Sequence, residues 1–216
     1  MSSNAVMLFA AILPPMTAAT TAAGSARSLS ALLREGASSR EMAEHLDGLS
    51  AAARVDEVRA IRGSGVGKLY EAVADAPAIT PDEFVPVSTT GTLIYEGGNS
   101  LPAFNRFQKR FLRLKSGMII GYNHQAMGFV TGPGYFAVKP ANGEGPHGKE
   151  MFFDYTVPAP ESPAGWPAYK SNDSGLSKLV YGGMIDFVRR VARGVVVGKA
   201  YVNGVDRKAY FTLTLP

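Results

Sequence analysis

The strand pattern at the end of the chain constrains the fold more than any other feature of the sequence. An apolar set alternates with a semi-polar set, namely Ala209, Phe211, Leu213 and Leu215 against Tyr210, Thr212 and Thr214. Two further β-rich runs, 184–191 and 195–202, precede it, and the connections are short, with Asn203-Gly204 favouring a tight hairpin turn. Three strands joined by short turns form a meander, the building pattern of up-and-down barrels. The sequence therefore predicts a mainly β protein built on an antiparallel up-and-down β-barrel.

More short strands are predicted in the middle of the chain. β-branched and aromatic residues fill the runs 118–122, 128–131, 135–139 and 151–157. Glycine-rich turns divide these runs, and a proline-rich stretch at 158–167 is expected to be a long loop. These runs supply the remaining strands of the barrel.

Residues 99–115 interrupt the strand pattern. Apolar side chains recur there at helical spacing, at Phe104, Phe107, Phe111 and Leu114. Ser100 is a suitable N-cap, and Pro102 just after it is typical of a first helical turn. We therefore predict a basic helix over 99–115 that lies over one end of the barrel.

The first part of the chain is helical in character. Runs at 28–36, 38–48, 50–62 and 66–75 are rich in Ala, Leu, Glu and Arg, and the first three open on a serine that can cap a helix. Ser38 and Glu41 have the spacing of a capping box. The organisation expected from the sequence is a leader (1–27), a helical extension (28–76), a proline-rich connector (77–86) and a barrel domain (87–216).

The leader contains an apolar run at 5–13 that ends at two prolines. It is too short for a membrane-spanning helix, which needs roughly 20 apolar residues. It has the length of a signal-peptide core, but the first basic residue is Arg27, so the charged region that precedes such a core is missing. We expect a cytoplasmic protein. The alternative is a secreted or periplasmic one, with residues 1–24 as the signal peptide.

Composition excludes several classes of chemistry. The 216 residues include no cysteine and three histidines, which excludes disulfide scaffolds, thiol catalysis and iron–sulfur clusters and leaves little for a metal site. We expect neither a metal nor a cofactor. A net charge of +4 is far from the excess of a dedicated nucleic-acid binder, so we expect no nucleic-acid partner. The sequence leaves the oligomeric state open.

Four short motifs resemble those of the GXWXG-type family of small proteins. They are Gly91-Thr92-Leu93, Gly98-Asn99-Ser100-Leu101, Phe107-Gln108-Lys109-Arg110-Phe111, and the ending 184–191 with Gly198 and Tyr210-Phe211. Leu93 stands in place of the family's tryptophan, and the helical N-terminal part lies outside the resemblance. The resemblance implies a lipocalin-like barrel with a hydrophobic interior. That shape is closer to carriers and to occasional isomerases or cyclases than to hydrolases.

Several conspicuous residues have plain structural interpretations. Residues 63–68 lack the spacing and the Ser or Thr of a phosphate-binding loop, so we interpret them as a flexible joint between helices. Trp166 is expected to plug a barrel end, and His147 to be exposed in its Gly-Pro loop. An inward Asp186 would need a basic partner, for which the expected residues are Arg189, Arg190 or Lys199.

The candidate site residues come from two regions. Tyr122 and His124 are two apart on a predicted strand, so both point to one face and have the groups for acid–base catalysis. Lys109 and Arg110 belong to the basic segment, which at the barrel mouth would neutralise a ligand carboxylate. No nucleophile elbow accompanies His124, so a Ser-His-Asp triad is not supported.

The favoured hypothesis is that the barrel interior binds a small hydrophobic or amphipathic molecule, lipid-like or polyketide-like. The candidate ligand-binding residues are Arg110, Lys109, Tyr122, His124, Tyr155 and Tyr181. One alternative is an isomerase or cyclase that acts on a hydrophobic substrate through His124, which requires an inward His124 near a second titratable group. The other is peripheral contact with a membrane surface or a partner through the basic segment 106–115.

Overall fold

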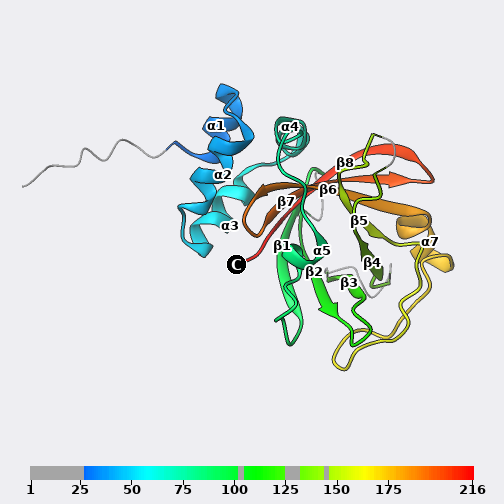
Figure 1. Cartoon of the computed structure of the whole chain (residues 1–216). Coiled ribbons are helices and arrows are strands. Elements are labelled where there is room, and N and C mark those ends of the chain that lie inside the picture. The colour runs from blue at the N-terminus through cyan, green and yellow to red at the C-terminus, as the bar shows by residue number, and fades with distance from the viewer. Residues whose placement is uncertain (1–26, 102–104, 125–131, 144–145) are drawn as a thin grey trace, which may run out of the picture.

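Eight antiparallel strands form a closed barrel in chain order, with the last strand paired to the first (Figure 1). The computed structural model describes residues 27–101, 105–124, 132–143 and 146–216. The strands are β1 (Leu93–Asn99), β2 (Arg106–Arg113), β3 (Ile119–His124), β4 (Phe136–Lys139), β5 (Met151–Asp154), β6 (Met184–Ala192), β7 (Val195–Val202) and β8 (Val205–Thr214). The predicted antiparallel up-and-down barrel with N-terminal helices is confirmed.

Aromatic side chains fill much of the barrel interior. Alternate residues of each strand point inward, and the resulting core cluster includes Tyr95, Phe111, Phe136, Phe153 and Phe211. The rings of Phe136 and Phe153 stack with centroids 5.1 Å apart, and Phe111 packs edge-on against Phe136 at 5.5 Å. Gly198 on β7 admits the Phe211 ring, because a Cβ atom at this position would lie 2.1 Å from it. The strand alternation thus builds the core directly.

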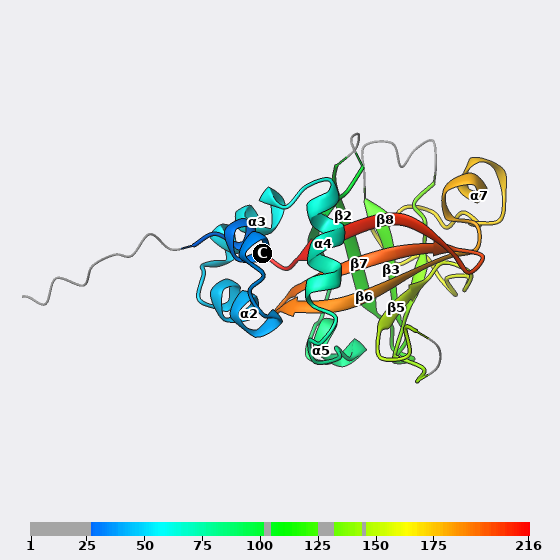
Figure 2. The same ribbon diagram turned by 90° about the horizontal axis from the view of Figure 1, so that it is seen from above.

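Four helices cover the last strands of the barrel (Figure 2): three of them contact β6, β7 or β8, and the first packs mainly on the other three. They are α1 (Leu29–Glu35), α2 (Ser39–Asp47), α3 (Ala51–Ala60) and α4 (Ser64–Ala72). Their apolar residues form one cluster with Val191, Val195 and Val197 of β6 and β7. Serine side chains cap the first three helices, and Ser38 and Glu41 form the predicted capping box. The helices therefore bury their apolar faces against the barrel wall.

The glycine-rich segment 63–68 begins a helix. It was expected to be a flexible joint, but α4 begins at Ser64 and includes Gly65 and Gly67. Gly67 allows α4 to approach β8 closely, since a Cβ atom there would lie 3.0 Å from the Tyr210 ring. Figure 2 shows α4 crossing the strands at this point. Close packing on the barrel explains Gly67 better than flexibility does.

The short helix α5 (Pro81–Phe84) closes one end of the barrel. Phe84 is buried in the core, where its ring stacks on Tyr95 with centroids 4.5 Å apart. The Tyr95 hydroxyl donates to the Phe84 carbonyl at 2.8 Å. Arg113 at the end of β2 donates to the Val85 carbonyl, and Arg190 near the end of β6 donates to two carbonyls of the preceding connector. The connector is thus tied into the closed end.

The predicted helix over 99–115 is wrong, because its described residues contain the strand β2. Phe107 and Phe111 are four residues apart, a spacing that places them on one face of a helix and equally on one face of a strand. Hydrogen bonding to β1 on one side and β3 on the other selects the strand. Lys109 consequently points inward with the phenylalanines, while Arg110 lies on the outer face. The segment therefore has no single basic face.

Trp166 was expected to plug a barrel end, but the loop that contains it covers the outer wall of the barrel instead. The Trp166 ring packs on Tyr122 and Tyr135 with centroids 4.7 and 5.9 Å apart, and its Nε1 donates to Thr92 Oγ1 at 2.9 Å. These tyrosines face outward, so they need a cover of their own. The short helix α7 (Gly175–Tyr181) follows this loop.

The strands predicted in the middle of the chain have mixed outcomes. The runs 118–122, 135–139 and 151–157 correspond to β3, β4 and β5. The strand predicted at 128–131 lies outside the described residues. So does nearly all of the predicted leader, of which only Arg27 is described.

Candidate functional site

Four polar side chains lie inside the barrel among aromatic rings. They are Lys109 on β2, Asn123 on β3, Tyr155 directly after β5, and Asp186 on β6. Each is at most 7% exposed. All four occupy inward positions, so the alternation that builds the core also brings them together. We call these four residues the polar cluster.

Lys109 is at the centre of the polar cluster. Its Nζ donates to Asn123 Oδ1 at 2.7 Å, to Asp186 Oδ2 at 3.2 Å and to the Tyr155 hydroxyl oxygen. The Tyr155 hydroxyl in turn donates to Asp186 Oδ2 at 3.1 Å, and Asn123 Nδ2 donates to the Tyr155 oxygen at 3.2 Å. The ammonium group therefore has an acceptor for each of its three protons.

The surroundings of the polar cluster are strongly apolar. Nζ of Lys109 lies 4.8 Å from the ring centroid of Phe136 and 5.1 Å from those of Tyr155 and Phe211, within the range of cation–π attraction. Burial lowers the pKa of Lys109, and Asp186 offsets part of this effect. Burial, together with the charge of Asp186, raises the pKa of Tyr155 well above its usual value. Lys109 therefore loses its proton more readily than an exposed lysine, whereas Tyr155 keeps its own.

A cavity of about 140 Å³ opens to solvent at the end of the barrel opposite α5, and the polar cluster forms part of its lining. Phe107 and Phe211 contribute apolar walls, while Leu101 and Val180 lie at the rim and are themselves exposed. The volume is close to that of a cavity that holds one benzene molecule, roughly 150 Å³. We call this space the mouth cavity.

Two residues outside the polar cluster fix the position of Tyr155. The ring of Tyr181, at the end of α7, stacks on the Tyr155 ring with centroids 5.6 Å apart and an interplanar angle of 2°. Asn172 donates from Nδ2 to the main-chain oxygens of Tyr155 and Tyr135, at 2.8 and 2.7 Å. Asn172 is buried, so it links the long loop to the floor of the mouth cavity.

The six candidate ligand-binding residues separate into two groups of three. Lys109, Tyr155 and Tyr181 all line the mouth cavity. The other three, Arg110, Tyr122 and His124, occupy outward positions of β2 and β3. Arg110 donates to Gln108 and to the Tyr122 hydroxyl there.

His124 does not meet the requirement of the acid–base hypothesis. That hypothesis needs an inward His124, but the side chain is exposed on the outer face, with its ring 6.3 Å from that of Tyr122. Burial and the neighbouring Arg110 lower its pKa. The strand alternation is the physical reason, because Asn123 takes the inward position.

The partners expected for Asp186 from the sequence are wrong, and Asn123 is a site residue that the sequence did not indicate. Asp186 pairs with Lys109 across the barrel, whereas Arg189, Arg190 and Lys199 bind other groups. Reading 106–113 as a strand would have placed Lys109 on the inward face with Phe107 and Phe111. The pairing itself depends on which strands meet across the closed barrel.

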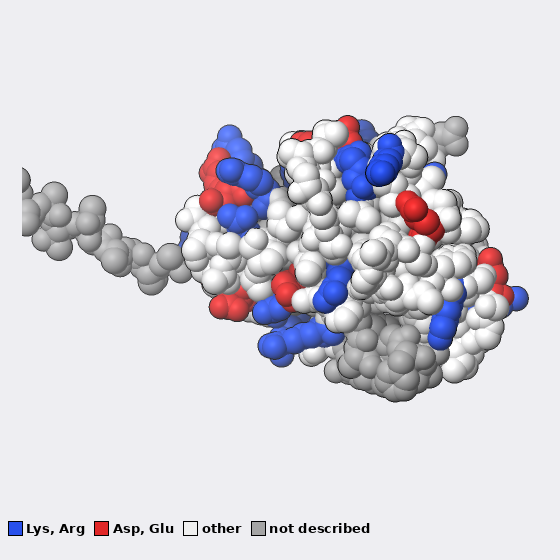
Figure 3. Space-filling model, turned by 90° about the horizontal axis from the view of Figure 1, so that it is seen from below, with Lys and Arg blue, Asp and Glu red and all other residues white. Residues whose placement is uncertain are grey.

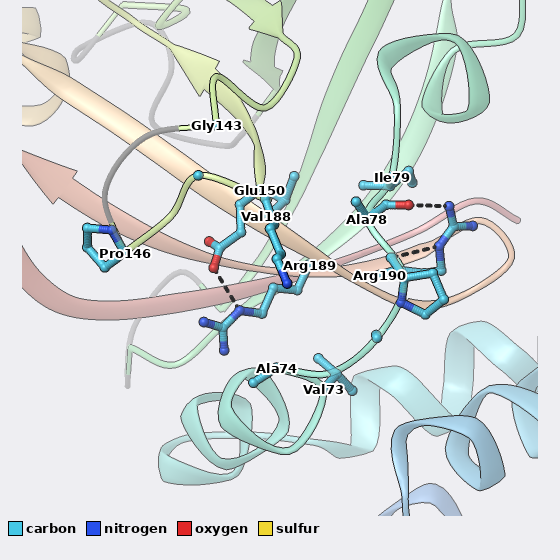
Figure 4. Close-up of a pocket in the computed structure, with 14 residues that line it drawn as sticks. Val73, Ala74, Ala78, Ile79, Gly143, Pro146, Glu150, Val188, Arg189 and Arg190 are labelled. Carbon is cyan, nitrogen blue, oxygen red and sulfur yellow. Dashed lines mark hydrogen bonds and ion pairs between the residues drawn. The ribbon is translucent and has the colours of Figure 1, made fainter.

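A second and larger hollow of about 490 Å³ lies near the closed end of the barrel (Figure 4). Three of the charged side chains there, Glu150, Arg189 and Arg190, have partners within the fold, and a fourth, Lys149, is exposed. Arg189 Nε donates to Glu150 Oε1 at 2.9 Å, and Arg190 donates to the carbonyls of Pro77 and Ala78. Glu150 also accepts from the Tyr70 hydroxyl at 2.6 Å, which ties α4 to the barrel. These contacts give the polar groups of this hollow a structural role.

His147 belongs to the same network, although it was expected to be exposed. Its Nδ1 lies 3.1 Å from Glu150 Oε2, and its ring stacks on Phe187 with centroids 4.3 Å apart. The side chain is 13% exposed. The loop folds back over the outer face of β6, which supplies both the aromatic surface and, through Arg189, the partner of Glu150.

The face of the molecule in Figure 3 carries its charges in a dispersed pattern. On the face in Figure 3, basic side chains are scattered among uncharged surface and acidic residues. Within the described ranges, no group of three or more His, Asp or Glu residues is placed to hold a metal ion. None of the helices in the described part of the chain is long and apolar enough to cross a membrane.

The comparisons with known proteins leave the site to be judged on its geometry. No family model matches the chain, and neither a curated protein nor a solved structure matches it.

Proposed function

We propose that the protein binds a small amphipathic molecule in the mouth cavity, with the polar end of the molecule on the polar cluster. The observation that carries this proposal is the place of Lys109 and Asp186, a buried ion pair on the lining of an open cavity. The apolar part of the ligand would lie against Phe107 and Phe211. This is the usual design of a ligand site, with apolar walls and a few converging polar groups.

The energetics of the ion pair support a role beyond stability. Taking two charges out of water is expensive, and well-packed apolar residues in their place are often as stabilising or more so. The rest of the barrel core is such a packing of aromatic rings. A charged pair that interrupts it at the cavity is therefore better explained by recognition of a polar group than by stabilisation of the barrel.

The size of the mouth cavity limits the ligand class. About 140 Å³ holds one ring or a short branched chain, and the stacked rings of Phe136 and Phe153 block the way deeper into the barrel. The chain of a fatty acid would have to leave through the mouth, over the exposed side chains of Leu101 and Val180. A compact carbonyl compound fits better, because its oxygen can take a hydrogen bond that Tyr155 or Lys109 otherwise gives to Asp186 or Asn123.

The motifs similar to the GXWXG-type family support the same proposal. Phe107 and Lys109 of the third motif and Phe211 of the last one line the mouth cavity. Leu93, which replaces the family's tryptophan, packs against the core cluster. We propose on this basis that the resemblance reflects a common barrel with its pocket at the mouth.

The test compares two probes of nearly equal shape, acetophenone and ethylbenzene, by NMR titration of the isotope-labelled full chain. We expect saturable binding of both, with acetophenone at least tenfold tighter because only it has a hydrogen-bond acceptor. Lys109→Met should remove most of that preference. Lys199→Met is the matched control, because Lys199 pairs with Asp206 on the outer face. If the wild-type protein binds neither acetophenone nor ethylbenzene saturably, the proposal is refuted.

A further inference from the structure

The amino group of Lys109 lies where a carbonyl carbon in the mouth cavity would reach it. Lys109 lines the cavity, and the rings around Nζ keep its surroundings apolar. An amine becomes a nucleophile when it loses its proton, and desolvation favours the neutral form. The lowered pKa of Lys109 agrees with this surrounding.

The neighbours of Lys109 supply the proton transfers that addition to a carbonyl needs. Asp186 Oδ2 lies 3.2 Å from Nζ and is a carboxylate that can accept its proton. The Tyr155 hydroxyl contacts Nζ directly, and its pKa is raised, so it is protonated and can donate to a carbonyl oxygen. Asn123 hydrogen-bonds both Lys109 and Tyr155, which holds the amine and the phenol side by side.

From this arrangement we propose that Lys109 forms a Schiff base with small hydrophobic aldehydes and ketones bound in the mouth cavity. The inference rests on the proposed function and names its substrate class. Lys109, Tyr155 and Asp186 are catalytic residues in this scheme, and Asn123 is a positioning residue.

The proton balance of the reaction closes within the polar cluster. Nζ first gives one proton to Asp186, and its lone pair then forms the C–N bond while the carbonyl oxygen takes the proton of Tyr155. The nitrogen next returns a proton to the Tyr155 phenolate, which leaves a neutral carbinolamine. The C–O bond then breaks, the hydroxyl leaves as water with the proton held by Asp186, and a protonated imine remains. Both side chains end as they began, and no oxidant or reductant takes part.

Reductive trapping tests the proposal. The full-length protein is incubated with a limiting amount of benzaldehyde and sodium cyanoborohydride, and the labelled lysines are mapped by peptide mass spectrometry. We expect Lys109 to carry the benzyl group in at least tenfold excess over Lys178, which is exposed on α7, and Lys199. Labelling of Lys109 should also persist to lower pH than the reaction of a free lysine side chain, whose neutral amine falls about tenfold for each pH unit below about 10.4.

Tyr155→Phe separates a chemical role from a structural one. This variant should still bind acetophenone saturably, though more weakly because one hydrogen-bond donor is lost. At saturating benzaldehyde it should form the Lys109 adduct at least tenfold more slowly. Equal labelling of Lys109 and Lys178, or an unlabelled Lys109 in protein that binds acetophenone, would overturn the Schiff base and leave the binding function standing. Absence of both acetophenone binding and labelling of Lys109 would overturn both.

Discussion

Replacing Asp186 by asparagine should strongly destabilise the protein, because it removes the counter-charge of a buried lysine. Lys109 and Asp186 are each 3% exposed, and their charged atoms lie 3.2 Å apart. In the variant Lys109 escapes an unpaired buried charge by giving up its proton. At pH 7 that costs about 5 kcal/mol, from about 1.36 kcal/mol for each pH unit below its ordinary pKa of 10.5. Breaking a buried pair typically costs roughly 3–5 kcal/mol, so we expect a loss in that range.

The loss should shrink as the pH rises. In Asp186→Asn, Lys109 is neutral in the folded state and protonated in the unfolded state. The folded variant therefore binds one proton fewer than the unfolded chain. Its free energy of unfolding therefore increases with pH, by about 1.36 kcal/mol per unit up to 10.5. The wild-type slope is smaller, because Asp186 favours the protonated form of Lys109. At pH 9 the expected difference is about 2 kcal/mol, from the same 1.36 kcal/mol per unit.

This difference is measured by urea denaturation of wild type and Asp186→Asn at a series of pH values. The series runs from neutrality to pH 10.0, which is the ordinary pKa of tyrosine. Asp206→Asn is the matched control, because Asp206 pairs with Lys199 at 3.0 Å but is 33% exposed. It should lose about 1 kcal/mol or less. The double variant Lys109→Met/Asp186→Asn should recover much of the lost stability, since no unpaired charge remains. A loss in Asp186→Asn no larger than in the control, or one independent of pH, would refute the reasoning.

Three further predictions concern the structure around the site. Phe84→Ala should lower the free energy of unfolding by about 3–5 kcal/mol, because it empties the closed end of the core; a calorimetric loss under about 1 kcal/mol would contradict the role of α5. Asn172→Ala leaves two buried carbonyls without a donor and should cost about 1–3 kcal/mol in urea denaturation, whereas an unchanged midpoint would argue against this link. Gly198→Val should displace the Phe211 ring, lower the free energy of unfolding by about 1–3 kcal/mol or more and weaken acetophenone binding. Wild-type affinity for acetophenone in this variant would contradict the role of Phe211 as a cavity wall.

Sequence patterns were sufficient where a local rule decided the outcome. The serine caps of α1, α2 and α3 follow from one side chain and the amides that it can reach. The last three strands follow from alternation and short turns. The helix predicted over 99–115 is wrong, because the spacing of Phe107 and Phe111 fits both the helical and the strand period. Only the hydrogen bonds offered by β1 and β3 distinguish the two conformations.

The sequence by itself determined the mainly β barrel, its helical N-terminal part and the exclusion of cysteine chemistry, because these depend on composition and short-range periodicity. It also selected Lys109, Tyr155 and Tyr181 as candidates, though without their relation to one another. Only the tertiary structure decided that Lys109 meets Asp186 inside the barrel and that His124 stays outside. The physical reason is closure of the sheet. Lys109 and Asp186, which are 77 residues apart in the chain, become hydrogen-bond partners because β2 and β6 face each other across the interior. No local sequence pattern specifies such a long-range contact.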